Sequence, residues 1–191
     1  MTTSNERDIY ESIGEFCIEF EHVCKNMEAC VITILAQNGL TSEPIQTVLL
    51  SGLAADGLRT LLQRLIAIGL QQSNSESKIV SLCFNKIQEL IAYRNDIIHS
   101  KWFVFLKKEE DEFIPWANGE KLYSNKNGPV PKRFSYSVQD FKEGSEQCRE
   151  CYIIISLIIR CLLKYRTITE CFTIKEKNLV INYHALKPDL I

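Results

Sequence analysis

The residues best suited to chemistry lie between positions 89 and 100, near the end of an apolar segment. Arg94 is followed by the amide residue Asn95, and His99 comes four residues after Asn95. A histidine with an ordinary pKa of about 6.5 can accept or donate a proton near neutral pH. An arginine offers a charged fork that matches phosphate oxygens and needs an anionic partner. These residue types indicate acid–base chemistry on an anionic substrate.

The spacing along a helix limits what one chain can do with these residues. At about 100° per residue, Asn95 and His99 share a face, whereas Arg94 and His99 are roughly 140° apart. One straight helix therefore cannot aim both at one point. If two copies pack with these helices crossing, each cleft receives Arg94 and His99 from both subunits. We therefore expect a homodimer.

The segment resembles the signature of the HEPN (higher eukaryotes and prokaryotes nucleotide-binding) family. That signature is an arginine, a polar residue beside it, and a histidine after four to six intervening residues. Arg94, Asn95 and His99 match it, with four residues between the first and the last. The resemblance covers about residues 6–165. It implies an all-α, up-and-down bundle of four to five helices that dimerises around the motif.

The resemblance also implies a metal-independent endoribonuclease that needs no cofactor. In such an enzyme the 2′-OH of RNA attacks its own phosphodiester and leaves a cyclic phosphate and a 5′-OH. His99 would transfer protons, Arg94 would stabilise the charge that builds on the phosphate, and Asn95 would orient the phosphate or the imidazole ring. DNA lacks the nucleophile and would not be cleaved. The implied biology is a toxin or antiviral defence effector, with an antitoxin or regulatory protein as a further partner.

Two alternatives stay open on the sequence alone. The bundle could be a catalytically inactive HEPN-like module that binds a protein partner or a nucleotide. It could also be a purely structural helical dimer in which Arg94 and His99 form an ion pair and a helix cap. Glycine-rich phosphate loops, nucleophile elbows and zincin motifs are absent from the sequence, which excludes the common NTPase, hydrolase and metalloprotease classes.

Acidic residues near the motif are candidates to support it. Asp56 could pair with Arg94, because it begins a neighbouring helix among small residues that allow close approach. The alternative, which the sequence favours, is an N-terminal acid that complements its own helix dipole. Asp96 is two residues from Arg94 and faces elsewhere, so we expect a solvated side chain.

Two further groups of residues could bind ligands. The segment 121–136 interleaves basic and aromatic residues and could track an RNA backbone, with Lys132 and Arg133 as substrate-binding residues; a solvated insertion is the alternative. Cys148 and Cys151 have the two-residue spacing of a zinc half-site, but no second half follows at usable spacing. We therefore expect packing thiols and no metal.

Apolar periodicity predicts the elements that must position these residues. Helices are expected over about 6–37, 43–50, 53–68 and 79–98, and a last long helix over 138–165 with Ser137 as its N-cap. The predicted bundle is therefore residues 6–165. Residues 102–136 are expected to be an irregular insertion with a short hairpin and a charged turn over 107–112. A C-terminal extension over 166–191 is expected to form a small hairpin.

Composition sets the remaining limits. The 191 residues are 46% hydrophobic and 24% charged, which is typical of globular proteins and excludes intrinsic disorder. A formal charge of −2 excludes a global field that would draw the chain to nucleic acid or anionic lipid. The start of the chain lacks the pattern of a secretory signal, and residues 151–163 are too few to span a bilayer. We expect a cytoplasmic protein that does not enter a membrane.

Overall fold

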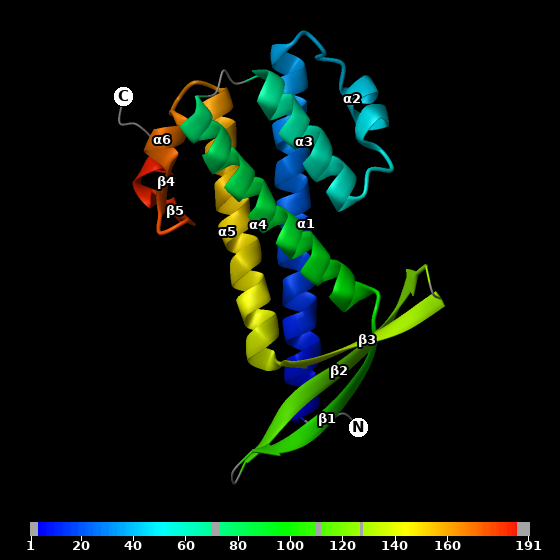
Figure 1. The fold of residues 1–191 in the computed structure, drawn as a ribbon. Helices are drawn as coiled ribbons and strands as arrows, with labels where there is room; N and C mark the ends of the chain where they lie inside the picture. Colours follow the sequence, from blue (N-terminus) through cyan, green and yellow to red (C-terminus); the bar gives the residue numbers. More distant parts are fainter. Residues whose placement is uncertain (1–3, 70–72, 110–111, 127, 187–191) are drawn as a thin grey trace. The chain divides into compact units, whose positions relative to one another are not determined.

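A computed structural model describes residues 4–69, 73–109, 112–126 and 128–186 (Figure 1). The chain divides into two compact units, one made of Met1–Glu21 and Leu90–Cys148 and the other of His22–Glu89 and Arg149–Ile191. The helices are α1 (Ser4–Gln37), α2 (Glu43–Leu50), α3 (Ala55–Gly69), α4 (Asn74–Ile98), α5 (Val138–Leu162), α6 (Ile168–Cys171) and the short 3₁₀-helix η1 (Tyr183–Leu186). The strands are β1 (Lys101–Glu109), β2 (Glu112–Asn125), β3 (Gly128–Ser137), β4 (Phe172–Lys175) and β5 (Asn178–Ile181).

The predicted all-α class is wrong, because the chain is a mixture of helices and two antiparallel sheets. Residues 101–137 form a regular three-stranded sheet in the order β1-β2-β3, where an irregular insertion with a short hairpin was expected. Of the predicted charged turn over 107–112, residues 107–109 and 112 belong to strands, since Lys107 and Lys108 pair with Ile114 and Phe113, and residues 110–111 lie outside the described residues. A run of charged residues in a sequence is typical of a loop, so the pattern predicts a turn here. An exposed strand can carry the same residues, because its pleat directs alternate side chains into solvent.

The long helices follow the predicted periodicity closely. Every fourth or third residue of α1 is buried, from Ile9 through Phe16 to Ile34. The helix ends before Gly39, which has a φ of +90° as expected for a C-cap glycine. Ser137 accepts a hydrogen bond from the backbone N–H of Asp140 at 3.3 Å, and so the predicted N-cap of α5 is confirmed.

The unit that contains the motif has an aromatic core. The Tyr93 ring packs against Phe16 at 5.2 Å and against Tyr136 at 5.5 Å between centroids, and Trp102 lies 5.8 Å from Phe141. The Tyr93 hydroxyl donates to the Asp140 carbonyl at 3.2 Å. These contacts join the end of α4 to α1, α5 and the inner side of the sheet, and so they position the residues that follow Tyr93.

The other unit is held by apolar helix faces and a buried amide. Asn26 on α1 donates to the Tyr152 carbonyl and the Ser156 hydroxyl of α5, both at 2.9 Å. The predicted C-terminal hairpin is confirmed as β4 and β5. The short helix α6 was not predicted, although Thr167 and Glu170 form a capping box at its start. No described helix of the chain is long and apolar enough to cross a membrane.

Candidate functional site at the end of α4

Arg94 lies on the side of α4 that faces α1 within the same unit. Its guanidinium carbon is 5.4 Å from the centre of the Phe20 ring, and its Nη2 is 3.9 Å from Oε1 of Glu21. Nη1 donates to Oδ1 of Asn95 at 3.3 Å. The side chain is 27% exposed. Its stem is therefore held by packing, while the ion pair is too long to be a close hydrogen bond.

His99 comes directly after the last residue of α4 and is exposed. Its backbone N–H donates to the Asn95 carbonyl at 3.3 Å, which continues the helical pattern for one more residue. In the described part of the chain, no side chain forms a hydrogen bond or ion pair with the imidazole ring. The structure thus gives His99 a fixed backbone and a ring open to solvent.

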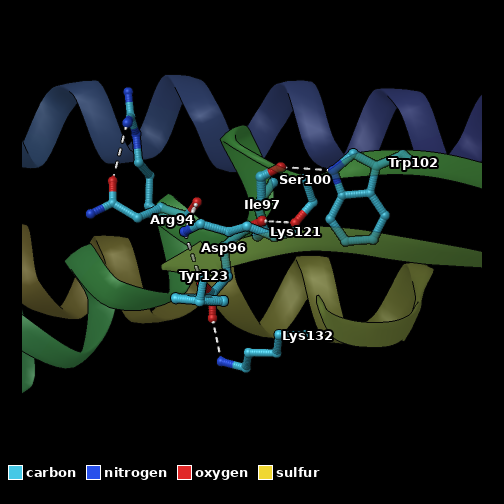
Figure 2. A network of polar contacts seen from close by, with 9 residues as sticks. Arg94, Asp96, Ile97, Ser100, Trp102, Lys121, Tyr123 and Lys132 are labelled. Carbon is cyan, nitrogen blue, oxygen red and sulfur yellow. Dashed lines mark hydrogen bonds and ion pairs between the residues drawn. The ribbon is translucent and has the colours of Figure 1, made fainter. Parts of the chain in front are cut away.

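Asp96 is the centre of a polar network that joins α4 to the sheet (Figure 2). Its carboxylate accepts hydrogen bonds from Lys121 at 3.2 Å and from Lys132 at 2.8 Å, and the Tyr123 hydroxyl also donates to it. Lys121 donates as well to the Asn95 carbonyl at 3.0 Å. The Asp96 side chain is only 14% exposed, so the expectation of a solvated side chain is wrong.

The network shifts the ionisation of its members. Burial by itself raises the pKa of the Asp96 carboxyl, but hydrogen bonds from Lys132, Tyr123 and Lys121 outweigh burial and lower the pKa below its ordinary value. The hydrogen bond to Asp96 raises the pKa of Lys132. Both groups therefore stay charged at neutral pH, and the network remains an ion pair.

The last turn of α4 is also capped by the strand that follows it. The indole N–H of Trp102 donates to the Ile97 carbonyl at 2.7 Å, and the Ser100 hydroxyl donates to the Asp96 carbonyl (Figure 2). Carbonyls at a helix end need such partners. The sheet therefore fixes where α4 ends, and with it the position of His99.

The predicted substrate-binding pair is divided by the sheet. Lys132 and Phe134 point to the helix side, where the Lys132 ammonium pairs with Asp96 and lies 4.6 Å from the centre of the Phe134 ring. Arg133 points to the opposite side, where its Nε donates to Glu120 at 3.1 Å. Of the predicted strip over 121–136, Lys121, Tyr123, Lys132 and Phe134 therefore form a basic and aromatic cluster on the helix side. Arg133 is not part of this cluster, because neighbouring residues of a strand face opposite sides.

Asp56 has a partner in its own helix. Its Oδ1 accepts from Nε of Arg59 at 2.9 Å in the first turn of α3. The carboxylate that approaches the Arg94 guanidinium is that of Glu21. Glu21 was missed because a single exposed acid on a long amphipathic helix carries no signal of its own.

The cysteine pair is buried on α5. Cys148 is 0% exposed and Cys151 is 2% exposed, and burial raises the pKa of the Cys151 thiol to about 12. A protonated thiol is a poor metal ligand. Within the described ranges, no group of three or more His, Cys, Asp or Glu residues could hold a metal ion.

The structure brings Arg94 and Asn95 into contact and leaves His99 beyond them on the same helix end. The sequence predicts Lys121 and Tyr123 only as members of the basic and aromatic strip over 121–136. Their contact with Asp96 depends on the pairing of strands, which the sequence pattern does not predict. Comparisons with protein-family models, curated proteins and solved structures gave no match, so the interpretation of this site depends on its own geometry.

Proposed function

We propose that this chain is a metal-independent endoribonuclease of the HEPN type that cleaves RNA as a homodimer. The observation that supports it is a difference in bonding among the residues at the end of α4. Tyr93, Asp96 and Ile97 are occupied by packing or by close hydrogen bonds. Among the described residues, Arg94 has no ion pair shorter than 3.9 Å, and the His99 ring has no bonded partner. In a purely structural motif, Arg94 and His99 would have close partners within the chain.

Arg94 has the geometry of a phosphate-binding side chain. Packing on Phe20 orients the guanidinium, Nη1 donates to Asn95 at 3.3 Å, and the Glu21 carboxylate at 3.9 Å leaves Nη2 without a close hydrogen bond. An arginine fork that is oriented in advance can bind two oxygens of a phosphate as negative charge builds in the transition state. Asn95, in contact with Arg94, orients the guanidinium or the phosphate.

His99 has the position of a general acid–base group. It lies at a helix end that Lys121, Trp102 and Asp96 hold in place, while its ring remains accessible. Arg94 and His99 diverge by roughly 140° on the helix. We therefore place the working site at a two-fold contact, where Arg94 of one copy meets His99 of the other.

The cellular setting is what the resemblance to the HEPN family implies. The proposal therefore includes a cytoplasmic toxin or antiviral defence effector that an antitoxin or regulatory protein controls. An inactive binding module or a structural dimer remains the alternative, and variants of the motif separate these readings from the enzyme.

The test compares RNA cleavage and thermal unfolding for wild type, Arg94→Ala, His99→Ala and Arg7→Ala. Arg7 is a matched control, because its Nε also lies 3.9 Å from a glutamate, Glu11, on an exposed part of α1. We expect both motif variants to lose about 100-fold or more in cleavage, the size typical of a lost acid–base or charge-stabilising group, with unfolding unchanged. Arg7→Ala should cleave normally.

The contrary result is equally clear. If wild type is inert on total RNA while Arg94→Ala and His99→Ala each lower stability by about 1 to 3 kcal/mol, the motif serves structure and the ribonuclease proposal fails. Light scattering at micromolar concentration tests the dimer, and a monomer would contradict a site built from two copies.

A further inference from the structure

Two cysteine sulfurs are in contact between the end of α5 and the end of α6 (Figure 1). Sγ of Cys161 lies 3.6 Å from Sγ of Cys171, and the Cys161 thiol donates a hydrogen bond to the Cys171 sulfur. Both side chains are buried. Both residues belong to the unit of His22–Glu89 and Arg149–Ile191, so their separation does not depend on how the two units are arranged.

Hydrogen bonds fix the backbone of both cysteines. The Lys164 N–H donates to the Cys161 carbonyl at 3.0 Å at the end of α5. The Asn182 N–H donates to the Cys171 carbonyl at 2.8 Å, and its amide group donates to the Glu170 carbonyl at 2.9 Å. Because the backbone positions are held and the sulfurs already touch, rotation of the two side chains is the main movement that a bond between them needs.

The two thiols differ in ionisation. The hydrogen bond from Cys161 outweighs burial and lowers the pKa of the Cys171 thiol, and the nearby cations of Arg166 and Arg160 also lower it. The same hydrogen bond, together with burial, raises the pKa of the Cys161 thiol. The thiolate is the reactive form of cysteine. Cys171 is therefore the nucleophile of the pair, and Cys161 is the protonated thiol beside it.

Other cysteines of the chain do not have this activation. Burial raises the pKa of the Cys30, Cys83 and Cys151 thiols to about 12, which keeps them protonated at neutral pH. Burial also raises the pKa of the Cys17 thiol. A protonated thiol reacts slowly with an oxidant. Oxidation of the reduced chain should therefore begin at Cys171.

We propose that Cys161 and Cys171 form a redox-active dithiol that a hydroperoxide converts into an intrachain disulfide, which locks α6 and the β4-β5 hairpin to the end of α5. The inference does not depend on the proposed ribonuclease activity. It assigns a chemical reaction to two residues that take no part in the site at the end of α4.

The reaction has two steps. The Cys171 thiolate attacks one peroxide oxygen and the O–O bond breaks, which gives a sulfenic acid and an alkoxide that takes up the proton lost by Cys171. The Cys161 thiol then attacks the sulfenic sulfur, the S–O bond breaks, and water leaves. Two thiols and one hydroperoxide thus give one disulfide, one alcohol and one water; with hydrogen peroxide the alcohol is a second water.

The connection between the two cysteines favours a small oxidant. Lys164 has a φ of +62°, in the left-handed region that favours glycine, so the turn after α5 carries backbone strain. The α6 helix has four residues, and so short a helix has little stability of its own. Brief local opening of such a segment admits hydrogen peroxide more readily than a tripeptide such as glutathione disulfide. The contacting Cys161 thiol then captures the sulfenic acid inside the protein.

The test maps the cross-link in the full wild-type chain. Reduced protein is treated with a small molar excess of hydrogen peroxide, catalase stops the reaction, and free thiols are blocked in denaturant before digestion with trypsin. Trypsin separates the two cysteines, because Lys164 and Arg166 lie between them. We expect the peptides of residues 161–164 and 167–175 to be joined, at a mass lower by two hydrogen atoms, and to separate with dithiothreitol.

Single variants identify the sulfur that reacts first. Cys161→Ser keeps a hydroxyl that can donate to the Cys171 sulfur but removes the second thiol, so Cys171 should accumulate as a sulfenic acid that dimedone labels. Cys171→Ser should leave Cys161 unlabelled. Cys30→Ser is a control at a buried cysteine of α1 and should form the same cross-link as wild type.

Thermal unfolding tests the locking effect. A disulfide that closes a loop of about ten residues restricts the unfolded chain, so oxidised wild type should melt about 5 to 10 °C above the reduced protein. The same treatment should not raise the melting temperature of Cys161→Ser. An oxidised wild type that melts at or below the temperature of the reduced protein would overturn the locking.

Other outcomes of the peptide map would overturn the dithiol itself. These are a wild type without the joined peptides, a cross-link of Cys171 to Cys83, or Cys171 recovered as a sulfinic acid or a glutathione adduct. Dimedone on Cys161 of the Cys171→Ser variant would reverse the assigned roles. A chain that never cleaves RNA but forms the joined peptides would leave the dithiol standing while the ribonuclease proposal fails.

Discussion

Lys121 of β2 donates one hydrogen bond to the Asp96 carboxylate at 3.2 Å and another to the Asn95 carbonyl at 3.0 Å. A single ammonium group thus connects the middle of the sheet to the helix turn that carries the motif. Lys132 of β3 supplies the second cation to the same carboxylate. The position of Asp96, and with it that of His99, therefore depends on residues 25 and 36 positions after Asp96 in the chain.

Removing the carboxylate at the centre of this network should destabilise the protein. Asp96→Ala leaves the Lys121 ammonium partly buried without its anion, and we expect a loss of about 1 to 3 kcal/mol in the free energy of unfolding. Glu120→Ala removes an exposed pair with Arg133 and should cost about 1 kcal/mol or less. Urea unfolding of the two variants measures the contrast, and equal losses would contradict it.

The same carboxylate should make stability depend on pH at the acid end. Folding lowers the pKa of Asp96, so the unfolded chain binds its proton at higher pH than the folded chain does. The stabilisation is therefore complete above the unfolded value of about 3.9 and is lost as the pH falls through the lower folded value. The gap between wild type and Asp96→Ala should shrink from pH 7 toward acid pH. A gap that stays constant would show that Asp96 does not act through its charge.

Two glycine-to-alanine substitutions should have opposite effects. A Cβ at Gly119 would lie 2.8 Å from the Trp102 ring, which its bond to Ile97 and its aromatic neighbours hold in place, so Gly119→Ala should cost about 1 to 3 kcal/mol. Gly14 is inside α1, and a Cβ added there would meet no described atom within 4 Å, so Gly14→Ala should stabilise by about 0.5 to 1 kcal/mol. Thermal unfolding of both variants tests the pair; a stabilised Gly119→Ala would refute the close approach.

Cleavage by the proposed enzyme should not need a metal and should need the 2′-OH. Neither His99 nor Arg94 uses a cation in its role, so RNA cleavage should persist in EDTA and yield cyclic phosphate ends. An RNA with 2′-O-methyl groups should resist, because its internal nucleophile is blocked. Gel analysis with end-group mass spectrometry measures both. Cleavage of the methylated RNA, or complete loss of activity in EDTA, would exclude this mechanism.

Two thiols in the C-terminal half should be able to cross-link. The sulfur atoms of Cys161 and Cys171 are in non-bonded contact at 3.6 Å, so that a small movement of the two side chains would bring them to the roughly 2 Å of a disulfide, and both side chains are buried. Diamide, which accepts the two electrons and two protons, should convert them to a disulfide. Titration in denaturant should then find two thiols fewer than the eight of the reduced chain, whereas Cys161→Ser should lose none. An undiminished count for wild type would contradict this geometry.

The sequence by itself determined the helices and the motif. Apolar residues at steps of three and four place α1 and α4 within a few residues of their observed bounds, and Gly39 and Ser137 mark an end and a start. These signals are local, because the backbone hydrogen bonds of a helix join residues four positions apart. The apolar periodicity of a helix can therefore be recognised within one segment of the sequence. The adjacency of Arg94 and Asn95, with His99 after the last turn, follows from that helix alone.

Only the tertiary structure decided the sheet and what it does to the site. A strand can pair with residues far along the chain. The sequence around Lys107 or Pro131 does not predict which residue lies opposite in the neighbouring strand. The register sends Lys132 inward to Asp96 and Arg133 outward to Glu120, although the two are neighbours in sequence. Side chains alternate across a pleat, so function on each face could be assigned only after the pairing was known.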